Sequence, residues 1–383
     1  MNTKRAPKVR FKGFTDAWEL RKFESIAARA SSISADPTLP RVEYEDIISG
    51  IGLLNKDVKL KGISKPGIVF NQGDILYGKL RPYLHNWFLP SFSGLAVGDF
   101  WVLQPKDADS SFLFRLIQGQ QFDDVANQSI GTKMPRADWN LVSKTLFFVP
   151  TSIDEQALIG RYFRSIDNLI TLHQRKLDKT KKLRKAFLNL IFSQKLRFRG
   201  FDQSWRKLKI EDCFSERVER SEKGELISVT VNFGIVKAHS LDRKDNSSEN
   251  KSNYKIVRKD DIAYNSMRMW QGASGISLYE GILSPAYTVI IPKQGVSSLF
   301  FSYEFKLKKM LQTFQVNSQG LTSDTWNLKF PLLRNIVVEA PEYEEQEKVG
   351  IFFKKLDNLI THHQDKINQL TKLKTTFLKN MFI

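Results

Sequence analysis

The chain has 383 residues, more than one average domain, and 41% of them are hydrophobic and 12% aromatic. This composition predicts folded cores and excludes a disordered chain. The 59 Lys and Arg residues against 41 Asp and Glu residues give a net charge of +18. That excess favours a phosphate-binding surface over two alternatives, a charge that serves solubility and a surface for anionic membranes.

Cysteine usage and hydropathy narrow the class of protein further. The single cysteine, Cys213, excludes an internal disulfide and a cysteine-based zinc site. The first residues lead into no hydrophobic signal segment, and no apolar run reaches the ~18 residues of a membrane span. We therefore expect a cytoplasmic protein without a membrane segment.

The first predicted domain, residues 1–151, contains short β-type runs such as 67–70 (GIVF) and 100–103 (FWVL) between Gly, Pro, Asn and Asp residues. Its segment 73–80 (GDILYGKL) matches the G-x4-G-K pattern of a phosphate-binding loop. However, Leu80 occupies the place of the Mg²⁺-binding Ser or Thr, and Pro82 would break the helix that must follow. We therefore exclude a nucleotide site here.

Four side chains in the same region are candidates for reading DNA bases. Lys79, Arg81, Tyr83 and His85 alternate with the period of a strand, so we expect them to share one face. An internal ion pair between Arg81 and Asp74 is the alternative role for that arginine. Asp74 itself, and its counterpart Asp261, are expected to serve turns.

Residues 152–197 predict a long helix with a coiled-coil seam, about 60 Å long at ~1.5 Å per residue. Its seam positions alternate in steps of three and four residues: Phe163, Ile166, Ile170, His173, Leu177, Thr180, Arg184, Phe187 and Ile191. A helix that packs only on its own domain is the alternative. Between Arg161 and Arg199 it carries twelve basic residues, which suit a solvated face, DNA phosphates or an acidic partner equally well.

The rest of the chain repeats the first part. Residues 139–141 (WNL) return as 326–328 at a shift of 187, and residues 167–171 (DNLIT) return unchanged as 357–361 at a shift of 190. So many aligned identities indicate a tandem duplication. It predicts a second domain over 198–341 and a second long helix over 342–383.

The second helix repeats the seam at nine matching positions: Phe353, Leu356, Ile360, His363, Ile367, Leu370, Lys374, Phe377 and Met381. Two matching seams favour helices that pack on each other, antiparallel. His173 and His363 lie on the seams and predict either a polar pair that sets register or a metal site or pH switch. Six positions lie outside the seam and, being mostly leucine, predict a partner interface: Leu169, Leu183, Leu190, Leu359, Leu373 and Asn380.

The second domain has diverged where the first carries its candidate DNA-reading residues. Its matching segment presents Arg268, Trp270 and Gln271, with an ion pair to Asp261 as the alternative role of Arg268. No Pro-Pro pair of an amino-group DNA methyltransferase, no G-x-G-x-x-G turn and no H-E-x-x-H motif occurs in the chain. The sequence nominates no catalytic residue and no metal site.

Four segments resemble, in order, the motifs of type I restriction-modification specificity subunits. Residues 10–18 (RFKGFTDAW) resemble the motif that opens their domains, and 73–84 (GDILYGKLRPYL) their central recognition motif. Residues 131–136 (GTKMPR) are similar to the segment near the domain's end, and 154–170 to the central repeat. The likeness covers essentially the whole chain.

The resemblance implies an α+β fold with two tandem-duplicated α/β target recognition domains. Two long helices join them as an antiparallel coiled coil with pseudo-two-fold symmetry. It adds Lys133 and Arg136 in the first domain, and Gln319 and Thr322 in the second, as DNA-binding residues. Each domain would read one half of a bipartite, asymmetric duplex site, and divergence predicts different halves.

The resemblance also implies partners and places the chemistry outside this chain. The helices would set the spacer between the half-sites and dock two modification (methyltransferase) subunits, which restriction subunits join. S-adenosylmethionine, ATP and Mg would belong to those subunits, and this chain would carry no cofactor and no catalytic activity. An enzyme with an unrecognised site and an adaptor that binds no DNA are the rival interpretations.

Overall fold

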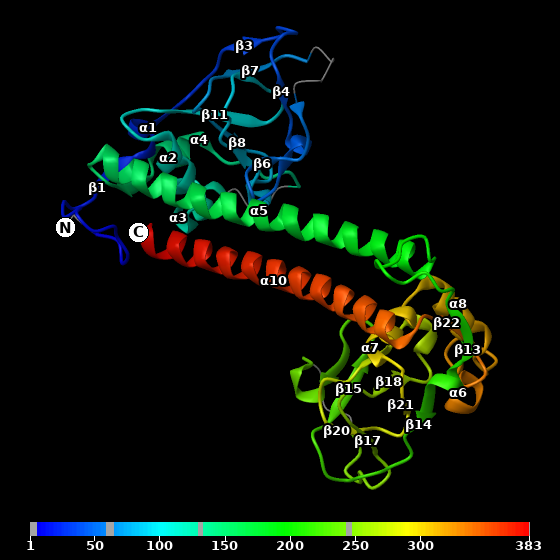
Figure 1. The fold of residues 1–383 in the computed structure, drawn as a ribbon. Coiled ribbons are helices and arrows are strands. Elements are labelled where there is room, and N and C mark those ends of the chain that lie inside the picture. Colours follow the sequence, from blue (N-terminus) through cyan, green and yellow to red (C-terminus); the bar gives the residue numbers. More distant parts are fainter. Residues whose placement is uncertain (1–5, 59–64, 129–132, 243–246, 383) are drawn as a thin grey trace. The chain divides into compact units, whose positions relative to one another are not determined.

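The computed structural model describes residues 6–58, 65–128, 133–242 and 247–382. The chain forms two compact units, residues 1–176 with 363–383, and residues 177–362. Each unit holds one globular head and parts of two long helices, α5 (Ile153–Phe192) and α10 (Tyr343–Met381) (Figure 1). Within the described residues, no helix combines the length and apolarity needed to cross a membrane.

The first head is built mainly from antiparallel strands. Two four-stranded sheets, β2-β11-β8-β9 and β3-β7-β10-β4, stand beside the pairs β1-β12 and β5-β6. The strands are β1 (Glu19–Lys22), β2 (Ala27–Arg29), β3 (Ile33–Ser34), β4 (Arg41–Val42), β5 (Ile47–Ile48), β6 (Leu53–Leu54), β7 (Gly67–Phe70), β8 (Ile75–Gly78), β9 (Trp87–Phe88), β10 (Gly94–Ala96), β11 (Phe100–Pro105) and β12 (Leu146–Val149). The helices are α1 (Phe23–Ile26), η1 (Tyr44–Asp46), η3 (Pro82–Leu84), α2 (Ser110–Leu116), α3 (Gln120–Ala126) and α4 (Trp139–Lys144).

The second head repeats this plan. Its sheet β14-β21-β18-β19 has the same strand order as β2-β11-β8-β9, and the pairs β13-β22, β17-β20 and β15-β16 surround it. The strands are β13 (Arg206–Lys209), β14 (Phe214–Glu216), β15 (Ile227–Thr230), β16 (Gly234–Lys237), β17 (Lys255–Val257), β18 (Ile262–Asn265), β19 (Ser274–Ile276), β20 (Gly281–Leu283), β21 (Tyr287–Pro292) and β22 (Val337–Ala340). The helices are α6 (Ile210–Cys213), η4 (Ala238–Ser240), η5 (Met269–Gln271), α7 (Ser298–Glu304), α8 (Lys308–Val316) and α9 (Phe330–Leu333).

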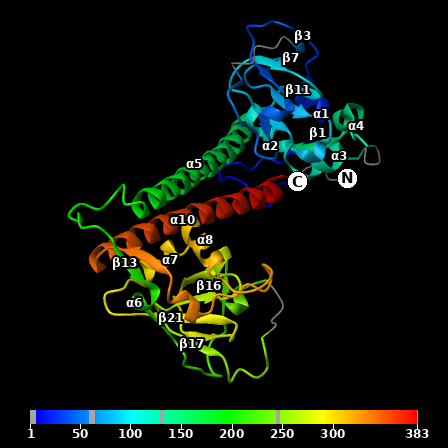
Figure 2. The ribbon, with the colours of Figure 1, turned by 90° about the vertical axis from the view of Figure 1, so that its right-hand side faces the viewer.

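The first and last described segments belong to the same unit and lie side by side (Figure 2). Val9 donates its backbone N–H to the carbonyl of Asn380 near the end of α10, at 3.2 Å. Phe382 packs with Phe112 of α2 and Trp18, with ring centroids 5.6 and 6.4 Å apart. The end of α10 therefore completes the core of the first head.

Buried ion pairs attach each long helix to its head. Arg10 forms two hydrogen bonds with the carboxylate of Glu155, at 2.6 and 2.7 Å, and Arg197 repeats them with Glu345 at 2.8 and 2.6 Å. Both glutamate side chains are only 1% exposed. Arginine's planar fork suits such bidentate pairing, which explains why both residues recur in the duplication.

A single glycine in the first turns of each long helix permits close packing. A side chain on Gly160 would meet the backbone of Ser111 in α2 at 2.8 Å, and one on Gly350 would meet Leu299 of α7 at 2.9 Å. Because real β-carbons do not approach so closely, only glycine fits. Each helix thus lies directly on a helix of its own head.

The two long helices also pair with each other inside each unit. In the first unit Asp167 of α5 contacts Lys374 of α10 at 2.9 Å, and the Nδ1 atoms of His173 and His363 lie 3.1 Å apart. Later positions of α5 meet earlier positions of α10, so the pairing is antiparallel. The two-headed α+β fold with paired helices, predicted from the sequence, is confirmed.

The second unit repeats this pairing with the roles of the helices exchanged. Arg184 of α5 forms an ion pair with Asp357 of α10, and the rings of Phe187 and Phe352 pack edge to face at 5.2 Å. The nine seam positions expected in each helix are all buried or half-buried. Among the described residues no cluster of three metal-ligating side chains occurs.

Candidate nucleic-acid interface

In the first head, the candidate residues meet where the central strand β8 ends. Lys79 accepts a backbone hydrogen bond from Ala137, and Arg81 donates one to Pro135, both at 2.8 Å. Leu80 forms a β-bridge with Arg136. Two candidate segments that are distant in the sequence, around Lys79 and Arg136, are therefore paired at the surface. We call this paired element the first reading loop (79–85 with 133–137). Residues 131 and 132 of the second segment lie outside the described residues.

The expectation that residues 79–85 form a strand is wrong. Arg81 and His85 adopt left-handed backbone conformations, with φ of 50° and 55°, and a 3-10 turn, Pro82–Leu84, lies between them. The reason is Pro82, which has no N–H for a sheet and fixes its own φ. The four candidate side chains therefore do not alternate on one strand face. Non-glycine residues rarely adopt positive φ, and such residues concentrate at binding sites.

One carboxylate organises the basic side chains of this loop. Lys79 Nζ lies 3.5 Å from one oxygen of Asp99, and Arg136 Nη2 lies 3.1 Å from the other. Tyr44 also contributes, because its hydroxyl accepts the backbone N–H of Leu80 at 3.1 Å. Burial raises the pKa of that hydroxyl, which stays neutral. Sequence reasoning missed Asp99 and Tyr44, since neither lies in a recognised motif.

The ion pair that we considered for Arg81 does not form. Asp74 instead accepts a hydrogen bond from the backbone N–H of Asn71 at 2.8 Å and so closes the turn before β8, the role expected of it. Arg81 is exposed, and within the described part of the chain its guanidinium has no recorded ion pair. The guanidinium therefore faces solvent, where a ligand can reach it.

The remaining two candidates of the first reading loop lie beside it. Tyr83 is 53% exposed. His85 stacks on Trp87 with ring centroids 4.8 Å apart, and its Nε2 lies 2.9 Å from Asp123. Stacking and the carboxylate hold the imidazole in place, whereas the tyrosine is free to contact a partner.

The second head has a corresponding loop after β18, which we call the second reading loop (266–273 with 319–328). Leu328 donates its N–H to the carbonyl of Ser266 at 2.8 Å, and Gln319 forms a β-bridge with Asn327. Thr322 is exposed in a turn that Thr325 closes. As in the first head, a late segment of the domain pairs with the segment that follows the central strand.

The side chains of the second reading loop have different environments. Trp270 packs edge to face on Trp326 at 5.2 Å and donates its indole N–H to the carbonyl of Met267 at 3.1 Å. It therefore supports the loop from within. Gln271 is exposed, and the half-exposed Arg268 lies 3.9 Å from the exposed Asp324, its one ion-pair contact within the described residues. The guanidinium and the amide are both available to a ligand.

Arg268 does not pair with Asp261, as one interpretation of the sequence proposed. Asp261 is occupied by Arg217, which donates two hydrogen bonds to it at 2.7 and 2.9 Å. Asp261 also accepts the backbone N–H of Arg258 at 2.7 Å and so closes the turn before β18, as expected. The sequence contained no signal for Arg217, which lies 44 residues away along the chain.

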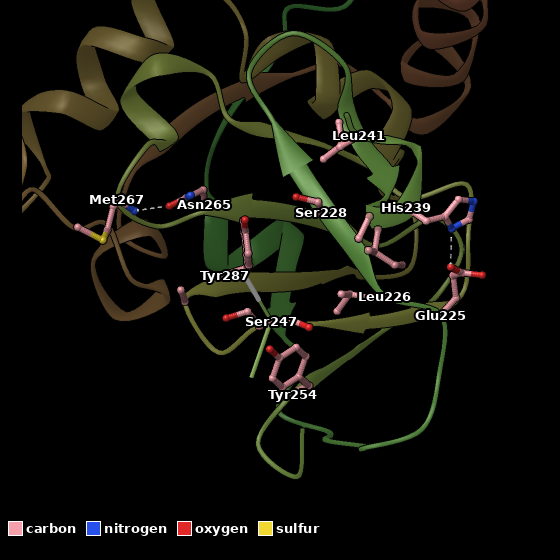
Figure 3. Close-up of a pocket in the computed structure, with 14 residues that line it drawn as sticks. Glu225, Leu226, Ser228, His239, Leu241, Ser247, Tyr254, Asn265, Met267 and Tyr287 are labelled. Atoms are coloured by element: carbon pink, nitrogen blue, oxygen red, sulfur yellow. Dashed lines mark hydrogen bonds and ion pairs between the residues drawn. The ribbon is translucent and has the colours of Figure 1, made fainter. Parts of the chain in front are cut away.

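A cavity of about 530 Å³ lies beside the second reading loop. Ser228 of β15 lines it on one side, and Asn265 and Met267 at the start of the loop line it on another (Figure 3). Asn265 accepts the backbone N–H of Met267 at 3.0 Å, and His239 contacts Glu225 at 3.1 Å. The hairpin β15-β16 and the reading loop are thus neighbours.

Comparison with known proteins gives a consistent result. Residues 205–372 match the family model of the type I restriction modification DNA specificity domain. The chain is similar to the MjaVIII specificity subunit of Methanocaldococcus jannaschii, with 24% identity over 147 residues, and to the EcoDI specificity subunit of Escherichia coli, with 25% identity over 150 residues, both of type I restriction enzymes. These alignments cover 36% and 38% of this chain, and only 34% of each relative.

One solved structure resembles the chain over its whole length. It is the S subunit of a type I restriction-modification system from M. genitalium, with a TM-score of 0.64 over 99% of both chains. The sequence identity is 15%, so this similarity shows a shared fold.

Proposed function

We propose that the chain is the non-catalytic subunit that selects DNA for a type I restriction-modification system, because residues 205–372 match the family model of the DNA specificity domain and the similar proteins are specificity subunits. Each head would read one half of a bipartite, asymmetric duplex site. One observation carries the proposal. Both heads end their central strand in a reading loop with accessible hydrogen-bonding side chains. Among the described residues, Arg81 of the first loop and Gln271 of the second are exposed, and Arg268 of the second is half-exposed with a 3.9 Å contact to Asp324.

The chemistry of the loops suits base edges in the major groove. Arginine pairs with the two acceptors of guanine, and glutamine pairs with adenine. In the first loop, Lys79 and Arg136 both contact the carboxylate of Asp99, and such basic side chains suit DNA phosphates. Since the second loop offers the amide of Gln271 beside Arg268, and the first loop offers basic side chains, the two heads would read different half-sites.

The long helices would hold the half-sites at a set spacing. α5 has 40 residues, about 60 Å at ~1.5 Å per residue. Twelve basic residues lie between Arg161 and Arg199, nine in α5 and three just beyond it. Arg184 and Arg197 form ion pairs, while residues such as Lys179 and Lys182 are exposed. These lysines could contact phosphates of the unread spacer or an acidic partner.

The exposed leucines of the helices support a docking role. Leu169, Leu183, Leu190, Leu359 and Leu373 are 39–47% exposed although they lie on a paired helix. We propose that two modification subunits cover them and that restriction subunits join the complex, with S-adenosylmethionine, ATP and Mg bound in those subunits. Changing Leu183 to Asp should then abolish co-purification with the modification subunit, whereas Lys182→Ala should preserve it. Unchanged co-purification of the Asp variant would exclude this face.

DNA reading is tested by selecting bound sequences from a random duplex library with the full-length chain. We expect two conserved segments separated by a fixed unread spacer, and an affinity that falls steeply as salt rises because phosphates are neutralised. Arg81→Ala should remove the consensus of one segment only. Salt-independent binding, or a library without enrichment, would contradict the proposal and favour an adaptor that binds no DNA.

A further inference from the structure

Each head carries a second exposed element beside its reading loop, the tip of a short β-hairpin. In the second head, Phe233 stands at the turn between β15 and β16 and is 74% exposed. In the first, Ile51 stands at the turn between β5 and β6 and is 47% exposed. Each residue directly precedes a glycine with positive φ, Gly52 at 75° and Gly234 at 64°. Positive φ favours glycine, so these glycines set the shape of both turns.

The second hairpin tip is fixed next to the second reading loop. The carbonyl of Val231 accepts a hydrogen bond from Lys306 at 3.2 Å, and the backbone of Gly234 lies against that of Ser274 and Gly275, just after the loop. Residues of β15 also line the cavity together with Met267 of the second reading loop, which is 39% exposed (Figure 3).

The first hairpin tip has the same neighbour. Gly50 donates its N–H to the carbonyl of His85 in the first reading loop at 3.0 Å, and Gly52 lies against the ring of Trp87. The first tip is therefore held by His85 of its reading loop, and the second tip by β19, the strand that directly follows its reading loop.

The residue type at the tips is unusual for a solvent-exposed turn. Hairpin turns favour Asn, Asp and Gly, and a single exposed apolar residue would need no explanation. Here, however, each head has an exposed apolar residue at a hairpin tip beside its reading loop, with Val231 at 44% and Ile48 at 37% exposure nearby. The two hairpins differ in their place along the repeat, yet both present an apolar tip next to the loop, which favours a common kind of partner.

We propose that Phe233 and Ile51 pack on thymine methyl groups in the major groove, next to the bases that the reading loops contact. This inference rests on the proposed function. An element held against a reading loop enters the same groove, and the thymine methyl is the apolar group that base edges offer there.

The test uses the full-length chain and the half-sites enriched from a random duplex library. We expect Phe233→Ala to weaken binding about tenfold and to lose the preference for thymine at one or two positions of the second half-site only. Phe233→Leu should retain the preference. Val218→Ala is the matched control, because Val218 is 72% exposed on the same head and should change neither property.

Replacing the preferred thymine with uracil removes only the methyl group, so it should weaken wild-type binding and leave the Phe233→Ala variant unaffected. If the wild type binds selectively but uracil is tolerated, or if Phe233→Ala matches the Val218→Ala control, the hairpin inference is overturned while the reading loops stand. If the wild type selects no sequence at all, the proposed function fails and the inference with it.

Discussion

Arg217→Ala should destabilise the second head strongly. The side chains of Arg217 and Asp261 are 6% and 2% exposed, and two hydrogen bonds at 2.7 and 2.9 Å join them. Without the guanidinium, the buried carboxylate keeps only the backbone N–H of Arg258 at 2.7 Å. Removing one partner of a buried ion pair costs about 3–5 kcal/mol, because the other charge stays buried without compensation.

Arg268→Ala is the matched control in the same head. Its contact with Asp324 is 3.9 Å long, and the aspartate side chain is 86% exposed. Such pairs contribute about 0–1 kcal/mol, so this variant should keep the stability of the head and lose DNA affinity. The double variant Arg217→Met with Asp261→Leu should recover much of the loss, since it leaves no unpaired buried charge.

Hydrogen exchange of the full-length chain, measured by mass spectrometry, separates the two heads. A loss of about 3 kcal/mol corresponds to roughly hundredfold faster exchange, expected for β18 and β21, while β8 and β11 of the first head serve as the internal reference. Exchange of β18 in Arg217→Ala within about threefold of the wild type would refute the reasoning about the buried pair.

Three further predictions concern pH, DNA contacts and spacing. Burial raises the pKa of the Glu304 carboxyl to about 8, above its ordinary 4.5, so the folded head favours the protonated form. The stability of the second head should therefore fall as the pH rises from about 4.5 past 8. Glu304→Gln should remove this dependence, as measured by hydrogen exchange at a series of pH values. Arg81→Ala should weaken binding to the first half-site by about 1–3 kcal/mol without lowering the melting temperature, because the side chain is exposed; unfolding of the first head would contradict this. Seven residues inserted between Lys176 and Lys185, with seven more at the facing place in α10, should lengthen the helix pair by ~10.5 Å and the spacer by about three base pairs. An unchanged spacer in selected DNA, with full affinity, would show that the helices do not measure it.

The sequence alone determined the repeated plan of the molecule. Identities at a nearly constant shift established two copies, and the steps of three and four residues between Phe163 and Ile191 identified the paired face of the helix. Both signals are patterns of residue type and spacing along the sequence, so they can be recognised without coordinates. The turn roles of Asp74 and Asp261 were also predicted from the sequence. In the structure each carboxylate accepts the backbone N–H of the residue three positions earlier, which is a local contact.

Only the tertiary structure decided which charged groups the fold uses and which it leaves exposed to a ligand. Arg217 and Asp261 are 44 residues apart, and Asp99 lies 37 residues from Arg136; such pairs depend on strand register, which no local pattern encodes. The left-handed conformation of Arg81 and the closeness of Phe233 to the second reading loop likewise follow from packing around the loops. A sequence does not distinguish an exposed arginine from a buried one. The candidate reading surface could therefore be identified only from the structure, which shows which arginines are buried in ion pairs.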